Sequence, residues 1–380
     1  MRVWIENPFD NLPSEGRRPQ RYWLMADAFR AAGHEVTLWT SDFSHATKRR
    51  RSCNAPGIVL IPTLPYSKNV CLARIRSHRA YAKAWLRLAR QQAAEVGPPD
   101  LLVVSVPPLS TGDAAIALKH EFGCRLVADI MDAWPETFER LFPRALKFFA
   151  PLALLPLRRA ADRAMRSADL VTGVCDAYGP LALGRGAKNY FRAYHGIACG
   201  SAAADLPRTP GDTTRLVYIG NLGRGYDLVA PIFAVRADPS LSLDIAGAGD
   251  WEPKWRALAA SSPRIRFHGY LGEAELDRLL DAAAVGIVPL SDATCVGLPY
   301  KLADYAAHGL RTVTSLRGEC AAFLERHRAG ATYVAGDVGS FRRAVATAKE
   351  LKPDFAGMRD ELDAGKIYSD YVKRVTEEPN

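Results

Sequence analysis

Short apolar runs alternate with helix-length segments through most of the chain, and this alternation constrains the fold more than any other feature of the sequence. Uninterrupted apolar runs of this length are typical of strands buried on both faces of a parallel sheet. Helices are predicted at Gln20–Ala32, which ends before Gly33, and at Thr111–Phe122. The pattern predicts an α/β domain with helices covering a parallel sheet. Its predicted strands are Val3–Ile5, Val36–Trp39, Ile58–Ile61, Leu101–Val104, Leu126–Val127 and Leu170–Val174.

The same pattern begins again in the second half of the chain. Residues 198–212 are rich in Ala, Ser, Gly and Pro without periodicity, so they are predicted to link two domains. Two doubly wound domains, 1–197 and 213–365, are therefore expected, with a cleft between them. A last helix, about 366–380, can pack on either domain, including back on the first. The elements predicted after the linker are strands at Leu216–Ile219, Leu241–Ala246, Ile265–Phe267, Val285–Val288 and Thr312–Thr314, and helices at Trp251–Ala260, Glu273–Ala284 and Lys301–His308.

The charge balance points to an acidic partner. The formal net charge is +9, which suits a nucleic acid, an anionic lipid or a phosphorylated substrate. No recognised nucleic-acid-binding module occurs, so no nucleic acid is expected. The sequence near Met1 lacks the apolar core of a secretory signal, and no apolar run could span a membrane, so a cytoplasmic protein is predicted. Cysteine and histidine spacing fits no zinc site, and neither metal nor other cofactor is predicted.

Two segments favour contact with a membrane surface. Residues 74–90 form a basic amphipathic helix in which Arg76, Arg79, Lys83, Arg87 and Arg90 share one stripe. Residues 147–159 are apolar between basic flanks and are too short to cross a bilayer. The alternative is a buried pair of helices with a solvated basic face. Taken together, the two segments predict peripheral binding to an anionic membrane, at the inner face of the cell membrane.

A glycine-rich turn follows the first strand of the second domain. In Gly220–Gly225, the backbone N–H groups of Gly220, Asn221 and Gly223 can approach a phosphate, and a following helix would favour negative charge there. Arg224 can add a bidentate phosphate contact. A glycine-rich turn without a ligand is an equal alternative. The spacing differs from the dinucleotide pattern GxGxxG, so a nicotinamide enzyme is disfavoured.

The segment Gly297–Tyr305 places a lysine at the start of a helix. Lys301 lies in the first turn after Pro299, and Asp304 is on the same helical face. A lysine here suits a diphosphate, and an aspartate beside it suits sugar hydroxyls. A surface Lys–Asp ion pair of little consequence is the alternative, favoured when the segment is read alone.

The first domain offers two candidate groups. Asp132 follows the strand at Leu126–Val127, where a doubly wound domain places its functional residues, although it could instead cap a turn. The loop Asn7–Arg21 follows the first strand and carries Gly16, Arg17 and Arg18, whose charges suit an anionic acceptor. A solvated loop is the alternative.

Six segments, in order, resemble glycosyltransferases of the GT-B fold, family 4 (group 1), in the bacterial polysaccharide branch of colanic-acid and O-antigen enzymes. Each segment alone is weakly specific, and the resemblance covers nearly the whole chain. It implies two Rossmann-like domains with a deep interdomain cleft, and a soluble enzyme that transfers sugars. The segments are Ala32–Thr37, Ser105–Leu109, Asp129–Glu136, Tyr218–Gly223, Phe267–Leu271 and Leu298–Gly309.

The resemblance also implies residue roles. Arg224 and Lys301 would neutralise the leaving diphosphate without a metal, and Asp304 would bind ribose. Tyr270 and Leu271 would border the base, and Tyr300 stands at the family's "PNK" asparagine. Asp132 would face the donor sugar, and Gly16, Arg17 and Arg18 would contact the acceptor. The chain departs from the family at Met131, where the "RDxWPE" segment has an arginine, and at Val296, where the first of two glutamates is expected.

These implications predict a retaining hexosyltransferase. Its donor would be a nucleoside-diphosphate sugar, with UDP favoured over GDP. Its acceptor would be a glycan or a polyprenyl-diphosphate-linked sugar in the synthesis of a bacterial surface polysaccharide or exopolysaccharide. Two alternatives stay open: a sugar-nucleotide 2-epimerase of the same fold, and an inert nucleotide-sugar-binding partner of a glycan assembly complex.

Overall fold

The computed structural model describes residues 1–16, 18–68, 71–139, 142, 144–197, 213–290 and 296–377. The chain forms two compact units. Unit 1 comprises Met1–Tyr194 with Gly365–Asn380, and unit 2 comprises His195–Ala364. The predicted linker, 198–212, lies outside the described residues, and the predicted cleft between the domains stays a prediction.

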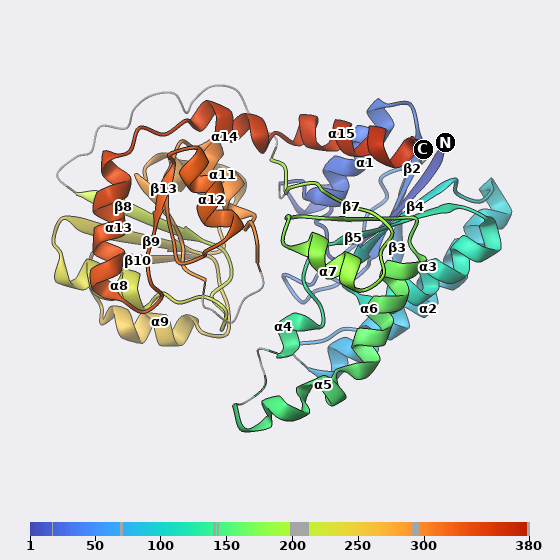
Figure 1. Ribbon diagram of the computed structural model, residues 1–380, viewed down its shortest axis with the longest axis horizontal. Coiled ribbons are helices and arrows are strands. Elements are labelled where there is room, and N and C mark those ends of the chain that lie inside the picture. Colours follow the sequence, from blue (N-terminus) through green and yellow to red (C-terminus); the bar gives the residue numbers. More distant parts are fainter. Residues whose placement is uncertain are drawn as a thin grey trace. The chain divides into compact units, whose positions relative to one another are not determined.

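Unit 1 is built on a parallel seven-stranded sheet, as the apolar runs predict (Figure 1). Its order is β3-β2-β1-β4-β5-β6-β7, so the order reverses between β1 and β4. Trp4 and Trp39 pack edge to face in the core, with ring centroids 5.1 Å apart. The strands are β1 (Arg2–Glu6), β2 (Glu35–Ser41), β3 (Ile58–Ile61), β4 (Leu101–Val106), β5 (Arg125–Ile130), β6 (Leu170–Gly173) and β7 (Tyr190–Arg192).

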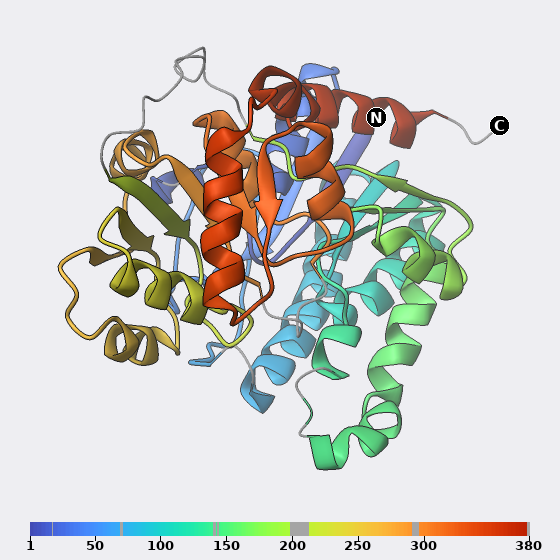
Figure 2. The same ribbon diagram turned by 60° about the vertical axis from the view of Figure 1, so that its left-hand side comes forward.

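Helices cover both faces of this sheet (Figures 1 and 2). On one face α2, α3 and α6 pack side by side. The predicted amphipathic helix at 74–90 is confirmed within α2, and its five basic residues are all exposed. The helices are α1 (Arg21–Ala31), α2 (Leu72–Val96), α3 (Leu109–Phe122), α4 (Glu136–Glu139), α5 (Ala150–Ala153), α6 (Leu155–Ser167) and α7 (Tyr178–Gly184), with 3-10 turns at Pro13–Glu15 and Arg144–Phe149.

The last helix, α15 (Ala364–Thr376), packs on unit 1. Its Tyr371 ring lies 6.3 Å from Phe29 of α1 and 5.5 Å from Phe191 of β7. Tyr368 and Tyr371 are fully buried. The C-terminal residues therefore complete the core of the N-terminal unit.

A buried ion pair ties α1 to the sheet of unit 1. Arg21 donates to both carboxylate oxygens of Asp129 at 2.8 Å, and both side chains are fully buried. Asp129 also accepts from Tyr22 (2.7 Å) and Thr172 (2.6 Å). Burial alone would raise the pKa of Asp129, but the charge of Arg21 and these hydrogen bonds lower it below its usual value. Arg21, which closes the loop expected to meet the acceptor, is thus a structural residue.

Unit 2 has a parallel six-stranded sheet of order β10-β9-β8-β11-β12-β13, with the reversal between β8 and β11. All five predicted strands of this half are confirmed. Sequence periodicity missed the three-residue edge strands of both sheets, β7 and β13. The strands are β8 (Thr214–Ile219), β9 (Leu241–Ala246), β10 (Ile265–Gly269), β11 (Val285–Val288), β12 (Arg311–Thr314) and β13 (Gly330–Thr332).

The helices of unit 2 flank both faces of its sheet (Figure 2). The three helices predicted in this half are confirmed, with ends that differ by at most three residues. None of the helices described in either unit is long and apolar enough to cross a bilayer. The helices are α8 (Val229–Ala237), α9 (Glu252–Ala259), α10 (Glu273–Asp281), α11 (Lys301–Ala307), α12 (Glu319–Arg326), α13 (Val338–Glu350) and α14 (Phe355–Glu361).

Candidate functional site

In a doubly wound sheet, ligands bind at the carboxyl ends of the strands, where the strand order reverses. In unit 2 this point lies between β8 and β11. The segments that leave these two strands there contain Gly220–Gly225 and Gly297–Tyr305, the two segments singled out from the sequence. The topology therefore brings both predicted donor segments to the same edge of the same sheet.

Lys301 carries an ammonium group that is buried in unit 2. Its side chain is 8% exposed, and Nζ has no hydrogen-bond acceptor among the described residues. Nζ instead lies over the rings of Tyr218 and Tyr226, at 4.3 and 4.4 Å from their centroids. Ring faces attract a cation, but they replace water only in part. Sequence reasoning assigned no role to the two tyrosines, although Tyr218 belongs to a segment that it singled out.

Burial lowers the pKa of Lys301 to about 7, and the charge of Asp304 offsets part of that shift. Asp304 is itself 8% exposed, so the alternative of a solvated surface pair is wrong. A buried charge persists in proteins when it has a partner, because an unpaired one loses its hydration without compensation. The site thus has the electrostatics of an anion-binding site whose ligand would restore the charge on Lys301.

Two glycine-rich loops meet beside this ammonium. A Cβ on Gly247, which has φ 133°, would lie 1.8 Å from the carbonyl oxygen of Gly220. The Gly220 N–H in turn donates to Ala246 O at 2.9 Å. At Gly220, with φ 126°, a Cβ would approach Lys301 Nζ to 3.4 Å. Glycine is therefore needed at 247 for the contact between loops, and at 220 it keeps the space beside the ammonium open.

We expect Gly247→Ala to destabilise unit 2 by about 2–4 kcal/mol, because the new methyl group meets backbone and the left-handed conformation is strained. Gly269→Ala is the matched control, since Gly269 has φ 67° with nothing within 4 Å of the added Cβ. It should show the conformational cost alone. Urea unfolding of both variants measures the difference. Equal losses of stability would mean that the contact between the loops is unimportant.

The loop after β8 departs from the expected turn and helix. Helix α8 begins only at Val229, so its dipole does not act at Gly220–Gly223. Asp227 accepts a hydrogen bond from the Val229 N–H (3.0 Å) and so occupies that helix start. A short antiparallel bridge between Tyr226 and Leu290 lies in the segment between the glycine-rich turn and this helix.

The other predicted donor residues are placed as follows. Asn221 and Arg224 are exposed on the loop after β8, beside Gly223, and Arg224 has no ion-pair partner in the part of unit 2 that the structure describes. Tyr300 immediately precedes α11, and its ring lies 4.8 Å from that of His195. Tyr270 and Leu271 follow β10, two strands away from β8. The predicted contacts of these residues with base, ribose and phosphate stay predictions.

In unit 1, Asp132 lies just beyond the carboxyl end of β5, at the predicted edge of the sheet. It accepts hydrogen bonds from Trp134 Nε1 (3.0 Å) and Thr137 Oγ1 (3.2 Å). Burial raises the pKa of Asp132, and these two hydrogen bonds and the charge of Arg74 lower it in part. A carboxyl with a raised pKa at this edge suits proton transfer or hydroxyl binding.

Sequence reasoning missed an aromatic and basic cluster that surrounds Asp132. The guanidinium of Arg74 lies 5.1 Å from the Trp134 ring centroid and donates to His78 at 3.3 Å. His45 contacts the Tyr66 hydroxyl at 2.6 Å. Burial, with the nearby charge of Arg74, lowers the pKa of both histidines to about 3 and keeps them neutral. These residues are far apart in sequence, so no local motif marks them.

The predicted acceptor loop is described only in part. Gly16 ends the turn at Pro13–Glu15 in a left-handed conformation, with φ 59°. Arg18 is half-buried, and Arg17 lies outside the described residues. An acceptor role for this loop stays a prediction.

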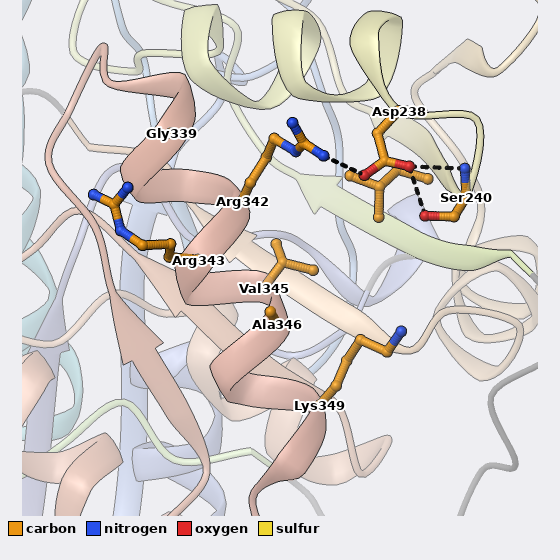
Figure 3. A pocket seen from close by; sticks show the side chains of 9 residues that line it. Asp238, Ser240, Gly339, Arg342, Arg343, Val345, Ala346 and Lys349 are labelled. Carbon is orange, nitrogen blue, oxygen red and sulfur yellow. Dashed lines mark hydrogen bonds and ion pairs between the residues drawn. The ribbon is translucent and has the colours of Figure 1, made fainter.

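A groove of about 470 Å³ lies elsewhere on unit 2, between α13 and the start of β9 (Figure 3). Arg342 pairs with Asp238 across it at 3.1 Å, and Ser240 donates to Asp238. It sits at the amino ends of the strands, the edge opposite Lys301, where doubly wound sheets do not bind their ligands. We do not assign it to the site. Within the described ranges, no three His, Cys, Asp or Glu side chains are placed to hold a metal ion.

Comparison with known proteins identifies the fold of the chain and one of its domains. Residues 213–350 match the family model "Glycosyl transferases group 1", which covers both donor segments of unit 2. No curated protein matches the chain. Solved structures match it from end to end at low identity.

A sucrose-phosphate synthase from Thermosynechococcus elongatus is 13% identical, with 99% of this chain and 94% of that chain covered and a TM-score of 0.69. Anabaena Alr3699/HepE in complex with UDP is 11% identical, covering 99% and 100%, with a TM-score of 0.69. The lipopolysaccharide outer core galactosyltransferase WaaB, in its apo form, is 13% identical, covering 99% and 99%, with a TM-score of 0.64. The chain therefore has the GT-B fold, and its second unit carries a glycosyl transferase group 1 domain.

Proposed function

We propose that this protein is a glycosyltransferase that binds a nucleoside-diphosphate sugar in unit 2. The observation that carries the proposal is Lys301, a buried ammonium at the strand-order reversal of a group 1 domain, for which the described residues offer no acceptor. A bound diphosphate would place negatively charged oxygens beside Lys301 Nζ and so give the ammonium an acceptor. The space beside Gly220 lies next to Nζ, where a phosphate oxygen can reach it.

In this reaction the bond between the sugar's anomeric carbon and the diphosphate oxygen breaks, and an acceptor hydroxyl forms the new bond and loses its proton. Charge develops on the departing diphosphate, so a preorganised cation lowers the barrier. Lys301 is assigned to that role, with Arg224 as a second, solvent-exposed cation on the facing loop. Asp132 is our candidate catalytic carboxylate in unit 1. We propose that transfer proceeds with retention of configuration and without a metal, as the resemblance stated above implies.

We further propose UDP as the nucleotide and a bacterial surface glycan, or its polyprenyl-diphosphate-linked precursor, as the acceptor. Support for UDP comes from Alr3699/HepE, which was solved with UDP. Support for a surface glycan comes from the likeness to WaaB, a lipopolysaccharide outer core enzyme. Asp304, Tyr270, Leu271 and Tyr300 are the candidate contacts of the nucleoside.

A thermal-shift screen of UDP- and GDP-sugars tests the donor site. A ligand at a hundred times its Kd stabilises the native state by about 2.7 kcal/mol, which gives a clear rise in Tm. We expect UDP-sugars to give the largest rise. If no nucleotide sugar shifts the transition, the donor-site assignment is wrong.

Measuring the release of free nucleoside diphosphate then distinguishes a transferase from the two alternatives. A transferase releases it in proportion to added acceptor. A 2-epimerase converts the sugar nucleotide without any acceptor and releases none as product. Tight binding without turnover on any acceptor would indicate the inert binding partner instead.

A further inference from the structure

Unit 1 carries an exposed apolar projection, which we call the tip, formed by residues 147–157. It spans the end of the 3-10 turn, α5 and the start of α6, and projects from the unit near the label α5 (Figure 1). Phe148 is 87% exposed and Leu152 72%, with Phe149 and Leu155 also exposed. Aromatic and aliphatic side chains exposed together to this degree mark an interaction surface.

The start of α2 continues this surface. Helices that alternate with parallel strands begin at the carboxyl edge of the sheet, so the first turns of α2 and α6 share that edge. Both figures show the beginning of α2 at the same end of unit 1 as the tip. Leu72 and Ile75 are exposed there, and so is Leu64, whose carbonyl accepts from Ser77 of α2 at 2.6 Å.

Basic residues predominate around this surface, although Arg158 of α6 is paired with Glu139. Residues 43–94 contain eleven Lys and Arg and no Asp or Glu, and residues 140–161 contain no acidic residue either. Arg76 and Arg79 of α2 and Arg159 of α6 are exposed, with no ion-pair partner among the described residues. These side chains can reach anionic groups that lie beside the apolar patch.

We propose that the tip and the first turns of α2 dock on an anionic lipid bilayer. The aromatic side chains of the tip enter the interface, and the arginines meet lipid phosphates. Charge complementarity selects this occupant, because an apolar patch within a predominantly basic surface matches apolar chains beneath anionic headgroups. The carboxyl edge of the unit 1 sheet, with Asp132, then faces the bilayer. This orientation suits a lipid-anchored acceptor, an inference that rests on the proposed function.

Co-sedimentation of the full chain with lipid vesicles tests the proposal. We expect binding to phosphatidylcholine vesicles that contain phosphatidylglycerol, and much weaker binding to phosphatidylcholine alone. Phe148→Ser combined with Phe149→Ser and Leu152→Ser should weaken binding at least about tenfold, since each lost side chain removes interfacial burial. Arg76→Gln with Arg79→Gln should weaken it about fivefold for each charge removed. All of these positions are exposed, so folding should be unaffected.

Two controls sit at other places on α2. Val96→Ser removes an exposed apolar residue at its far end. Arg87→Gln removes an exposed charge about 16 Å along the helix from Arg76, beyond the usual screening length. Both should bind like the wild type. Equal binding by the tip variant, or equal loss by the controls, would overturn the proposal.

The proposal would also be overturned if the wild type did not bind vesicles but formed a concentration-dependent dimer that the tip variant abolished. That result would indicate self-association through the tip. The vesicle assay contains no nucleotide, and the tip variant should keep the wild-type thermal shift with UDP-sugars. Failure of membrane docking is thereby distinguishable from failure of the proposed donor site.

Discussion

Replacing Lys301 with methionine is expected to stabilise the free protein and to abolish its binding of nucleotide sugars. Methionine has a similar length and fills the space between the Tyr218 and Tyr226 rings without a charge to desolvate. The pKa of Lys301, lowered to about 7 by burial, corresponds to a cost on the order of 5 kcal/mol for carrying the charge in the free protein. The Lys301 side chain therefore destabilises the free protein and is expected to stabilise the complex with the ligand.

The gain should depend on pH in a defined direction. Between pH 7 and 10.5 the unfolded chain holds a proton on Lys301 that the folded protein has released. The wild type's free energy of unfolding therefore receives a contribution from Lys301 that rises with pH through this window. Lys301→Met lacks that contribution, so its advantage is largest below pH 7 and disappears near pH 10.5. Urea unfolding at several pH values measures it.

Binding should show the reverse linkage. A bound diphosphate raises the pKa of Lys301 again, so binding above pH 7 takes up a proton, and affinity falls by up to about tenfold per pH unit. Calorimetry in buffers of different ionisation enthalpy detects that proton. Lys254→Met is the control, because Lys254 also lies over ring faces, at 4.0 Å from Trp251, but on an exposed part of α9. The assignment of Lys301 to the diphosphate would be contradicted if the Lys301→Met variant were less stable than the wild type. It would also be contradicted if this variant bound nucleotide sugars normally.

The donor segments were recognisable in the sequence because each is local. Pro299, Lys301 and Asp304 lie within six residues, and a strand followed by glycines predicts a turn at Gly220 whatever the rest of the chain does. The burial of Lys301 was not predictable in the same way. It depends on Tyr226, held by a bridge to Leu290 more than sixty residues away. Read alone, the helix start looked like an ordinary surface ion pair.

Unit 1 shows the opposite case. Its strands other than β7, and α1, are predicted from apolar periodicity, but the residues around Asp132 converge from three different loops and α2. Arg74 and His78 looked like part of one basic helix, and only the fold shows that they face inward, toward Trp134, while Arg76 and Arg79 face outward. Helical spacing separates the two faces. It does not say which face meets the sheet's carboxyl edge.

Asp129→Ala is expected to lower the stability of unit 1 by about 3–5 kcal/mol, because it leaves the Arg21 guanidinium buried without its carboxylate. Two carbonyl oxygens, those of Ala193 and Tyr194, would still accept from Arg21, but they carry no full negative charge. The hydroxyls of Tyr22 and Thr172 would also lose their acceptor. Urea unfolding followed by tryptophan fluorescence should show an early transition.

The matched control is Asp113→Ala, which breaks the ion pair of Asp113 with Arg163, two side chains that are about half exposed. Solvated pairs contribute about 0–1 kcal/mol, so this variant should unfold nearly like the wild type. The double variant Arg21→Met with Asp129→Leu removes both charges and should recover most of the lost stability, since no ion remains unpaired. Nucleotide binding by unit 2 should survive in every variant that stays folded. A double variant as unstable as Asp129→Ala would show that packing and the tyrosine and threonine hydrogen bonds, and not the unpaired charge, dominate at this position.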